Sequence, residues 1–262
     1  MEAISFKTLK ILDWGPLPYG QALTRQMALV EERIAGLPPD HLVLVEHPPV
    51  VTMGRSGGLK DLRISKEALK QRGIDLYTVD RGGMATFHGP GQLVAYPIIK
   101  LQTKDLHQYL YTLLHTVATV LKGYSLEPIF KEGRPGIWVG SSKIASVGIA
   151  VRRWVAYHGI ALNVNTDLQA FNVIVPCGHP GETITSMAQE LGKSVDLEEV
   201  KRCFIEEFCK SFKYMDDSEG NATWPRHPDC LRRPTPMKPT LIKWREVSVN
   251  CIEPPSEKSP MA

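Results

Sequence analysis

The stretch from Arg81 to Gln92 reads RGGMATFHGPGQ and decides how the rest of the sequence is interpreted. It contains four glycines and one proline within 12 residues. Glycine lets the backbone adopt positive φ and lets a ligand approach closely, whereas proline stiffens the loop. Arg81, Thr86, His88 and Gln92 add hydrogen-bonding side chains to this frame. A plain turn between two strands and a ligand-binding loop both fit the pattern, and composition alone does not separate them.

The residues on either side exclude two familiar phosphate-binding loops. No Gly-Lys-Ser/Thr follows the glycines, so a Walker loop does not fit. No long amphipathic helix begins after them, so the dinucleotide fingerprint does not fit either. Extended segments are predicted instead over 74–79 and over 93–99, the second interrupted by Pro97.

The remaining pattern is that of an α+β protein rather than a regular alternation of strands and helices. Apolar residues at three- and four-residue spacing predict a helix over 17–35. Asp105 and Asp196 can each cap a further helix. The other predicted helices are 65–71, 105–122, 185–191 and 197–212. The other predicted strands are 4–12, 42–46, 50–53, 136–139, 142–151, 154–163 and 172–175.

The composition of the 262 residues is that of an ordinary soluble globular protein, with 43% hydrophobic and 23% charged residues. A net charge of +3 is too small to indicate nucleic acid or an anionic membrane as a partner. The N-terminus resembles neither a signal peptide nor a transit peptide, and no apolar run approaches the ~20 residues of a membrane span. A cytoplasmic protein is therefore expected.

The composition changes near residue 214. Eight prolines fall beyond this point, and apolar periodicity is lost apart from residues 241–244. We therefore expect one folded domain over 1–213 and an irregular, proline-rich extension over 214–262.

Cys177 is the candidate nucleophile among five irregularly spaced cysteines, which form no Cys-x-x-Cys pair of the zinc-ribbon type. It lies in a Pro-Cys-Gly turn after a β-branched run, where a side chain can be exposed. A nucleophilic cysteine needs a nearby cation, because its unperturbed pKa is about 8.5. The candidates for that partner are Lys143, His158, His179 and His88, so a papain-like Cys/His pair stays open. The simpler alternative is that Cys177 is a small core residue.

Lys143 and the run from His158 to Asn163 each allow two interpretations. A lysine in a strand commonly marks a solvated face, but a lysine withdrawn from water loses its proton more easily and suits proton transfer. Gly159 and Ala161 remove side-chain bulk, either for close strand packing or to line a narrow tunnel for an acyl chain. The residues alone do not decide between these interpretations.

Four motifs together resemble the lipoyl(octanoyl) transferases, the octanoyltransferases of lipoate biosynthesis. The stretch 81–92 is similar to that family's Arg-Gly-Gly…Thr-Tyr-His-Gly-Pro-Gly-Gln loop, with Phe87 in place of tyrosine. The other matching segments are 143–148, 158–163, and 172–178 with 183–187, which resemble its Lys-Ile…Ser-x-Gly, His-Gly-Leu-Ala-Leu-Asn and Pro-Cys-Gly…Thr-Ser-Met/Leu motifs. The resemblance covers about residues 10–213, so the domain 1–213 would be the catalytic domain.

The resemblance implies a biotin/lipoate protein ligase-like fold, with a mixed β-sheet flanked by helices, related to class II aminoacyl-tRNA synthetases. It implies transfer of an octanoyl group from octanoyl-acyl carrier protein to a lysine of lipoyl domains, in 2-oxoacid dehydrogenase E2 subunits and the glycine cleavage H protein. Cys177 would be the nucleophile, and Lys143 would lower its pKa. A monomer without metal or cofactor is expected. The expected substrate-binding residues are Arg81, Gly82, Gly83, Met84, Ala85, Thr86, Phe87, His88, Ser146, Val147, Gly148, Gly159, Ile160 and Ala161.

Several rival functions share parts of this pattern. An ATP-dependent lipoate or biotin ligase has the same fold and needs a lysine, but no nucleophilic cysteine. An amidotransferase would pass octanoyl groups between lipoyl domains. A hydrolytic cysteine enzyme and a non-catalytic protein that sequesters acyl carrier protein or acyl chains complete the set. The Pro-Cys-Gly turn at Cys177 favours acyl transfer.

Overall fold

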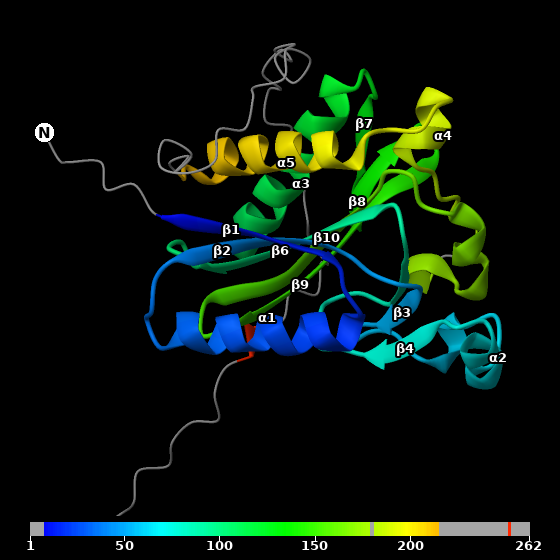
Figure 1. Cartoon of the computed structure of the whole chain (residues 1–262), viewed down its shortest axis with the longest axis horizontal. Coiled ribbons are helices and arrows are strands. Elements are labelled where there is room, and N and C mark those ends of the chain that lie inside the picture. The colour runs from blue at the N-terminus through cyan, green and yellow to red at the C-terminus, as the bar shows by residue number, and fades with distance from the viewer. Residues whose placement is uncertain (1–7, 179–180, 215–250, 253–262) are drawn as a thin grey trace, which may run out of the picture.

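A mixed β-sheet forms the centre of the computed structural model, which describes residues 8–178, 181–214 and 251–252 (Figure 1). Its strands run in the order β1-β2-β6-β10-β9-β8-β7. Only β1 and β2 are parallel along this path. The strands are β1 (Leu9–Pro16), β2 (Asp40–Glu46), β6 (Gln92–Lys100), β7 (Pro128–Lys131), β8 (Arg134–Val139), β9 (Ser142–Arg152) and β10 (Val155–Asn163).

Helices cover both faces of this sheet (Figure 1). The helices α3 (Leu106–Gly123) and α5 (Leu197–Phe212) pack on one face, and α1 (Tyr19–Ile34) packs on the other. The caps predicted from the sequence are confirmed. The carboxylate of Asp105 accepts from Gln108 N, and that of Asp196 accepts from Glu198 N. The architecture is the predicted mixed sheet flanked by helices.

A small second sheet carries the glycine-rich stretch. Its strands run in the order β4-β3-β5, with β3 (Val50–Met53) between β4 (Asp75–Thr78) and β5 (Ala85–His88). The short elements around it are η1 (Leu59–Asp61), α2 (Lys66–Gln71), η2 (Leu168–Val173), η3 (Pro176–Gly178) and α4 (Met187–Leu191). The centre of the glycine-rich stretch is therefore a buried strand, with loops only at its two ends.

Three expectations are corrected by the structure. Residues 172–175 do not form a strand: η2 extends to Val173, and Ile174 makes a single bridge to Leu62. The strand β7 gave no sequence signal and was missed.

The strand β6 continues through Pro97 without interruption. The pairing of β6 with β10 is broken between Ala156 and Ile160, so the missing N–H of Pro97 falls where no ladder bond is made on that side.

Little of the predicted extension 214–262 is described. Tyr214 is buried, and its hydroxyl donates to Asp40. The strand β11 (Cys251–Ile252) pairs with the end of β9. The remainder of the extension lies outside the described residues. None of the helices in the described ranges combines the length and apolarity of a membrane span, and the cytoplasmic location stays a prediction.

The helical face of the core gives a first test. Leu113 of α3 is 0% exposed and packs with α5 against the sheet. Leu113→Ala should lower the free energy of unfolding by about 2–5 kcal/mol, through lost burial and the cavity left behind. Urea unfolding measures this change. Leu59→Ala is the matched control, because Leu59 is 60% exposed; equal losses in the two variants would contradict the assignment of this core.

Candidate active site

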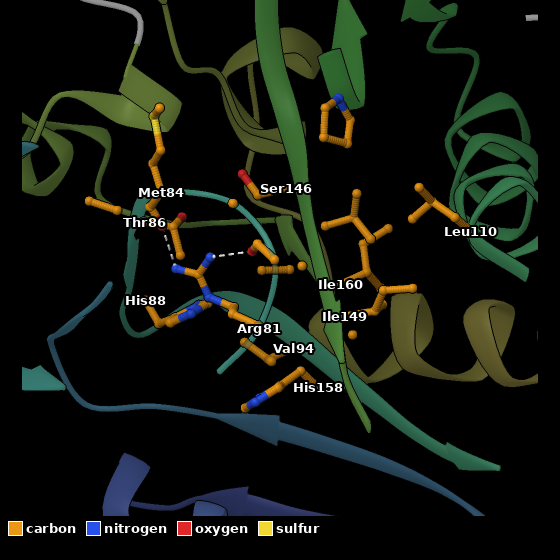
Figure 2. A pocket seen from close by; sticks show the side chains of 18 of the residues that line it. Arg81, Met84, Thr86, His88, Val94, Leu110, Ser146, Ile149, His158 and Ile160 are labelled. Atoms are coloured by element: carbon orange, nitrogen blue, oxygen red, sulfur yellow. Dashed lines mark hydrogen bonds between the residues drawn. The ribbon is translucent and has the colours of Figure 1, made fainter. Parts of the chain in front are cut away.

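A cavity of about 230 Å³ opens where β9 and β10 meet the loop 81–84 (Figure 2). All the residues predicted to bind substrate line it except Phe87. Lys143 lines it as well. The further lining residues are Tyr19, Ser56, Val94, Tyr96, Leu110, Gly133, Arg134, Pro135, Ile149, His158 and Glu182. Residues of the segments 81–88, 143–149 and 158–161 thus lie together around one cavity.

Phe87 belongs to the core of the small sheet instead. It is 2% exposed and makes an edge contact with Phe171, with ring centroids 5.4 Å apart. Its neighbours in β5, Thr86 and His88, both line the cavity. Side chains alternate between the two faces of a strand, so the middle residue points away. The position matched to tyrosine in the family loop therefore packs in the core.

Glycines bring the loop 81–84 onto β9. Gly82 N donates to Ile149 O at 2.9 Å. A Cβ on Gly148 would lie 2.9 Å from Arg81 Cδ and 3.0 Å from Gly82 O. Gly148 pairs across the strands with Gly159, where a Cβ would lie 2.0 Å from Ala95 O. Side chains at these positions would push the loop from the sheet and distort the sheet itself.

Arg81 holds the loop in shape. Its side chain is buried, and Nη2 donates to Thr52 O at 2.7 Å and to Met84 O at 2.9 Å. Nη1 donates to Gly82 O at 3.0 Å. The guanidinium group therefore fixes the backbone around Gly82 and Gly83, and it also places a positive charge at the cavity wall.

A buried chain of side chains links the glycine-rich stretch to the region after Cys177. His88 Nδ1 donates to Gln92 Oε1 at 2.7 Å, and Gln92 Nε2 donates to Asn163 Oδ1 at 2.9 Å. Asn163 Nδ2 then donates to Thr185 O at 2.9 Å. Burial lowers the pKa of His88 to about 3, so its imidazole is neutral near pH 7.

The imidazole of His158 bonds to Asp80. Its Nε2 lies 2.8 Å from Asp80 Oδ1, and its backbone N donates to Gln26 Oε1 at 2.5 Å. Burial lowers the pKa of His158. Burial alone would raise the pKa of Asp80, but hydrogen bonds from His158 and Tyr157 lower it to about 2. The backbone of His158 has φ of +54°, which accompanies the break in the pairing of β6 with β10.

Lys143 is buried in β9 and anchored through its backbone. Its side chain is 2% exposed. Lys143 N donates to Thr183 O at 2.8 Å, and Thr185 N donates to Lys143 O at 2.9 Å. A Cβ on Gly136 would lie 2.4 Å from Lys143 Cε, so only glycine leaves room for the lysine. The solvated-face interpretation of Lys143 is therefore wrong.

The Cys177 turn is fixed beside the cavity through its backbone. Gly178, at φ of +69°, packs so closely on Met84 that a Cβ would lie 2.1 Å from Met84 Sδ. Val175 N donates to Asp61 O at 2.8 Å. Met84 lines the cavity, so the turn follows its edge. The side chain of Cys177 and residues 179–180 lie outside the described residues, and their predicted roles stay predictions.

The sequence did not predict a role for Trp138, which contacts Lys143, or for Glu182, which bonds to Trp138. Glu182 lines the cavity, and its side chain is 2% exposed. Glu182 lies directly before Thr183, the first residue of the motif segment 183–187. A carboxylate next to this motif is the sequence feature that could have identified it.

Comparisons with known proteins agree with this fold. A family model of the lipoyl protein ligase A/B catalytic domain matches residues 18–209. The solved structure of a bi-partite lipoate protein ligase from Thermoplasma acidophilum has a TM-score of 0.61 at 19% identity, covering 81% of this chain and 86% of that chain. The fold is thus that of the lipoate protein ligases.

Sequence similarity identifies the family within this fold. The octanoyltransferase of Maridesulfovibrio salexigens is 40% identical over 206 residues, which cover 78% of this chain and 96% of that protein. The octanoyltransferase of Rubrobacter xylanophilus is 45% identical over 196 residues, which cover 74% and 89%. The chain belongs to the octanoyltransferase family of acyltransferases.

Acidification should lower the free energy of unfolding through His47, which bonds to Tyr96 of the cavity wall. Its Nδ1 donates to Leu17 O at 2.7 Å, and its Nε2 accepts from the Tyr96 hydroxyl at 2.8 Å. Burial lowers the pKa of His47 to about 4, against 6.5 when unfolded. The unfolded chain therefore binds the proton first, and stability falls as the pH drops below 6.5 toward 4.

The expected contribution of His47 to this loss is about 2 kcal/mol at pH 5. Urea unfolding from pH 7.5 to 4.5 measures it, comparing wild type with His47→Gln, whose slope should be shallower. His107→Gln removes an exposed histidine as the matched control and should follow wild type. Identical slopes for His47→Gln and wild type would contradict this linkage.

Proposed function

We propose that this chain transfers an octanoyl group from octanoyl-acyl carrier protein to a specific lysine of lipoyl domains, through a thioester on Cys177. The supporting observation is the position of Lys143. A buried lysine lines the same cavity as Met84, on which the Cys177 turn packs. A cation there would lower the pKa of the thiol, because an opposite charge favours the thiolate.

The cavity suits an acyl chain. Its walls include the apolar side chains of Val94, Leu110, Ile149 and Ile160. Gly148 and Gly159 contribute no side chains to it. Burying each methylene of an octanoyl chain contributes about 0.8 kcal/mol. A carbonyl near Met84 would leave the hydrocarbon to fill the space along β9 and β10.

The proposed reaction has two steps. The Cys177 thiolate attacks the thioester carbonyl, the bond from carbonyl carbon to phosphopantetheine sulfur breaks, and Lys143 gives its proton to the departing thiol. Neutral Lys143 then takes a proton from the incoming lysine amine, which attacks the enzyme thioester and releases Cys177. One thioester replaces another in the first step, so no ATP is consumed.

The acceptors that we propose are the lipoyl domains of 2-oxoacid dehydrogenase E2 subunits and the glycine cleavage H protein. The Thermoplasma structure of the same fold belongs to a study of a bi-partite lipoate protein ligase and its E2 lipoyl domain. We further propose that the enzyme acts as a monomer in the cytoplasm.

An ATP-dependent ligase is the alternative that shares the fold. The relatives that are 40–45% identical carry the name octanoyltransferase, whereas the ligase resemblance rests on 19% identity. The amidotransferase alternative differs in its donor, an octanoylated lipoyl domain. Substituting that donor for octanoyl-acyl carrier protein distinguishes the two.

Intact-mass analysis tests the reaction and its intermediate together. The enzyme mixed with octanoyl-acyl carrier protein, without ATP, should gain one octanoyl group and lose it when an apo lipoyl domain is added. Cys177→Ala should form no adduct and no product. Cys209→Ala removes a buried cysteine of α5 and is the matched control that should behave as wild type. An adduct on Cys177→Ala, or product formed only with ATP, would refute the proposal.

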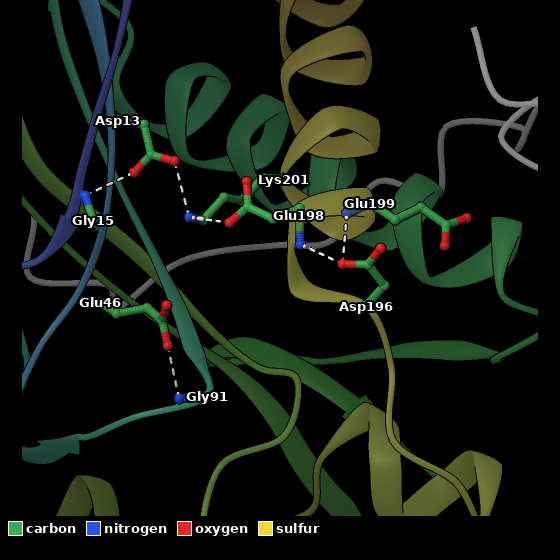
Figure 3. Close-up of polar contacts among 8 residues, drawn as sticks. All are labelled: Asp13, Gly15, Glu46, Gly91, Asp196, Glu198, Glu199 and Lys201. Carbon is green, nitrogen blue, oxygen red and sulfur yellow. Dashed lines mark hydrogen bonds and ion pairs between the residues drawn. The ribbon is translucent and has the colours of Figure 1, made fainter. Parts of the chain in front are cut away.

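The role of Lys143 is tested by the pH dependence of Cys177 alkylation. Lys143→Met removes the charge and keeps the length of the side chain, so the thiol pKa should rise toward about 8.5. Lys201→Met is the control, because Lys201 is also buried but pairs with Asp13 and Glu198 outside the cavity (Figure 3). An unchanged alkylation profile in Lys143→Met would exclude Lys143 as the partner of the thiol.

A further inference from the structure

Three basic side chains surround the ring of Trp138, and two of them, Arg134 and Lys143, line the cavity. The indole is fully buried in β8. Lys131 Nζ and Lys143 Nζ each lie 4.9 Å from the ring centroid, and the guanidinium carbon of Arg134 lies 5.7 Å from it. The face of an indole attracts cations, and the attraction is strongest where water is excluded.

Glu182 fixes the orientation of that ring. Trp138 Nε1 donates to Glu182 Oε1 at 2.8 Å. Arg134 Nη2 binds the other carboxylate oxygen at 2.7 Å. Since the Glu182 side chain is almost fully buried, these bonds are shielded from competing water. The indole therefore has one defined plane against which Lys143 can be placed.

The backbone directs Lys143 toward this ring. Ile137 pairs with Ala145 and Trp138 with Lys143, so Ile144 is the extra residue of a β-bulge in β9. Bulges change the direction of neighbouring side chains and occur next to active sites. Gly136 leaves the path of the lysine open, because a Cβ there would lie 2.4 Å from Lys143 Cε.

We propose that Trp138 is a positioning residue, which holds the ammonium group of Lys143 at the cavity wall while Glu182 holds the indole. This inference rests on the proposed role of Lys143 beside Cys177. A ring face attracts an ammonium group through its quadrupole and forms no bond to the proton itself.

The charged groups around Lys143 define the electrostatic setting of this contact. Lys131 and Arg134 share the indole, and Glu182 is the carboxylate beside it. Arg81 and His158 line the same cavity. The cations repel one another, which raises the free-energy cost of burying the Lys143 ammonium among them. Attraction to the ring face offsets part of that cost.

Two substitutions at Trp138 separate the ring face from its bulk. In Trp138→Leu the pH profile of Cys177 alkylation should move upward and octanoyl transfer should fall about tenfold, as expected for the loss of a desolvated cation–π contact. Trp138→Phe keeps a ring face and should recover part of both. Trp154→Leu is the matched control, because Lys104 Nζ lies 5.5 Å from that ring and neither residue lines the cavity.

Fluorinated tryptophans placed only at position 138 keep the size of the ring and weaken its attraction for cations. Transfer rate and the alkylation midpoint should then change progressively with the number of fluorine atoms, and the same series at position 154 should show no trend. This arm tests the proposal even where Trp138→Leu does not fold. No trend at position 138, with Lys143→Met still shifting the alkylation profile, would overturn the role of Trp138 alone. An unchanged alkylation profile in Lys143→Met would instead overturn the proposed role of Lys143.

Discussion

The pairing of residues 183–185 with Lys143 is the constraint on which the rest of the site depends. Both backbone groups of Lys143 bond to this segment, which lies outside the ladder of the main sheet. Asn163 adds a side-chain bond to Thr185 O. At the other end, Gly178 packs on Met84 and Val175 bonds to Asp61. The segment that carries Cys177 is thus fixed on both sides of the short 3-10 turn η3.

Absent side chains shape the site as much as present ones do. Gly148 and Gly159 face each other across β9 and β10, Gly136 makes room for Lys143, and Gly178 makes room for Met84. In each case an added Cβ would come within 3.0 Å of a neighbouring atom. A sequence shows that these residues are glycines. Which neighbour needs the space depends on contacts between distant segments, and only the structure supplies those.

Local signals in the sequence predicted the elements that local interactions determine. The caps at Asp105 and Asp196, the helix over 17–35 and the buried strand over 42–46 all occur within a few residues of their predicted positions. Residues 172–175 have a β-branched composition but no strand to pair with beyond one bridge, so η2 replaces the expected strand. Phe87 lies at a position of the family motif, yet its side chain packs in the core, because side chains along β5 alternate between the two faces of the sheet.

The electrostatics of the cavity favour an amine over an imidazole as the proposed partner of the Cys177 thiol. Burial lowers the pKa of His88 to about 3 and lowers that of His158 as well, so both rings are neutral near pH 7. A neutral imidazole supplies no positive charge to a thiolate, and protonating one in these surroundings costs free energy. Both rings are also committed to other hydrogen bonds, His88 to Gln92 and His158 to Asp80. Of the candidate partners in the described ranges, Lys143 is the amine, and its residue lines the cavity wall.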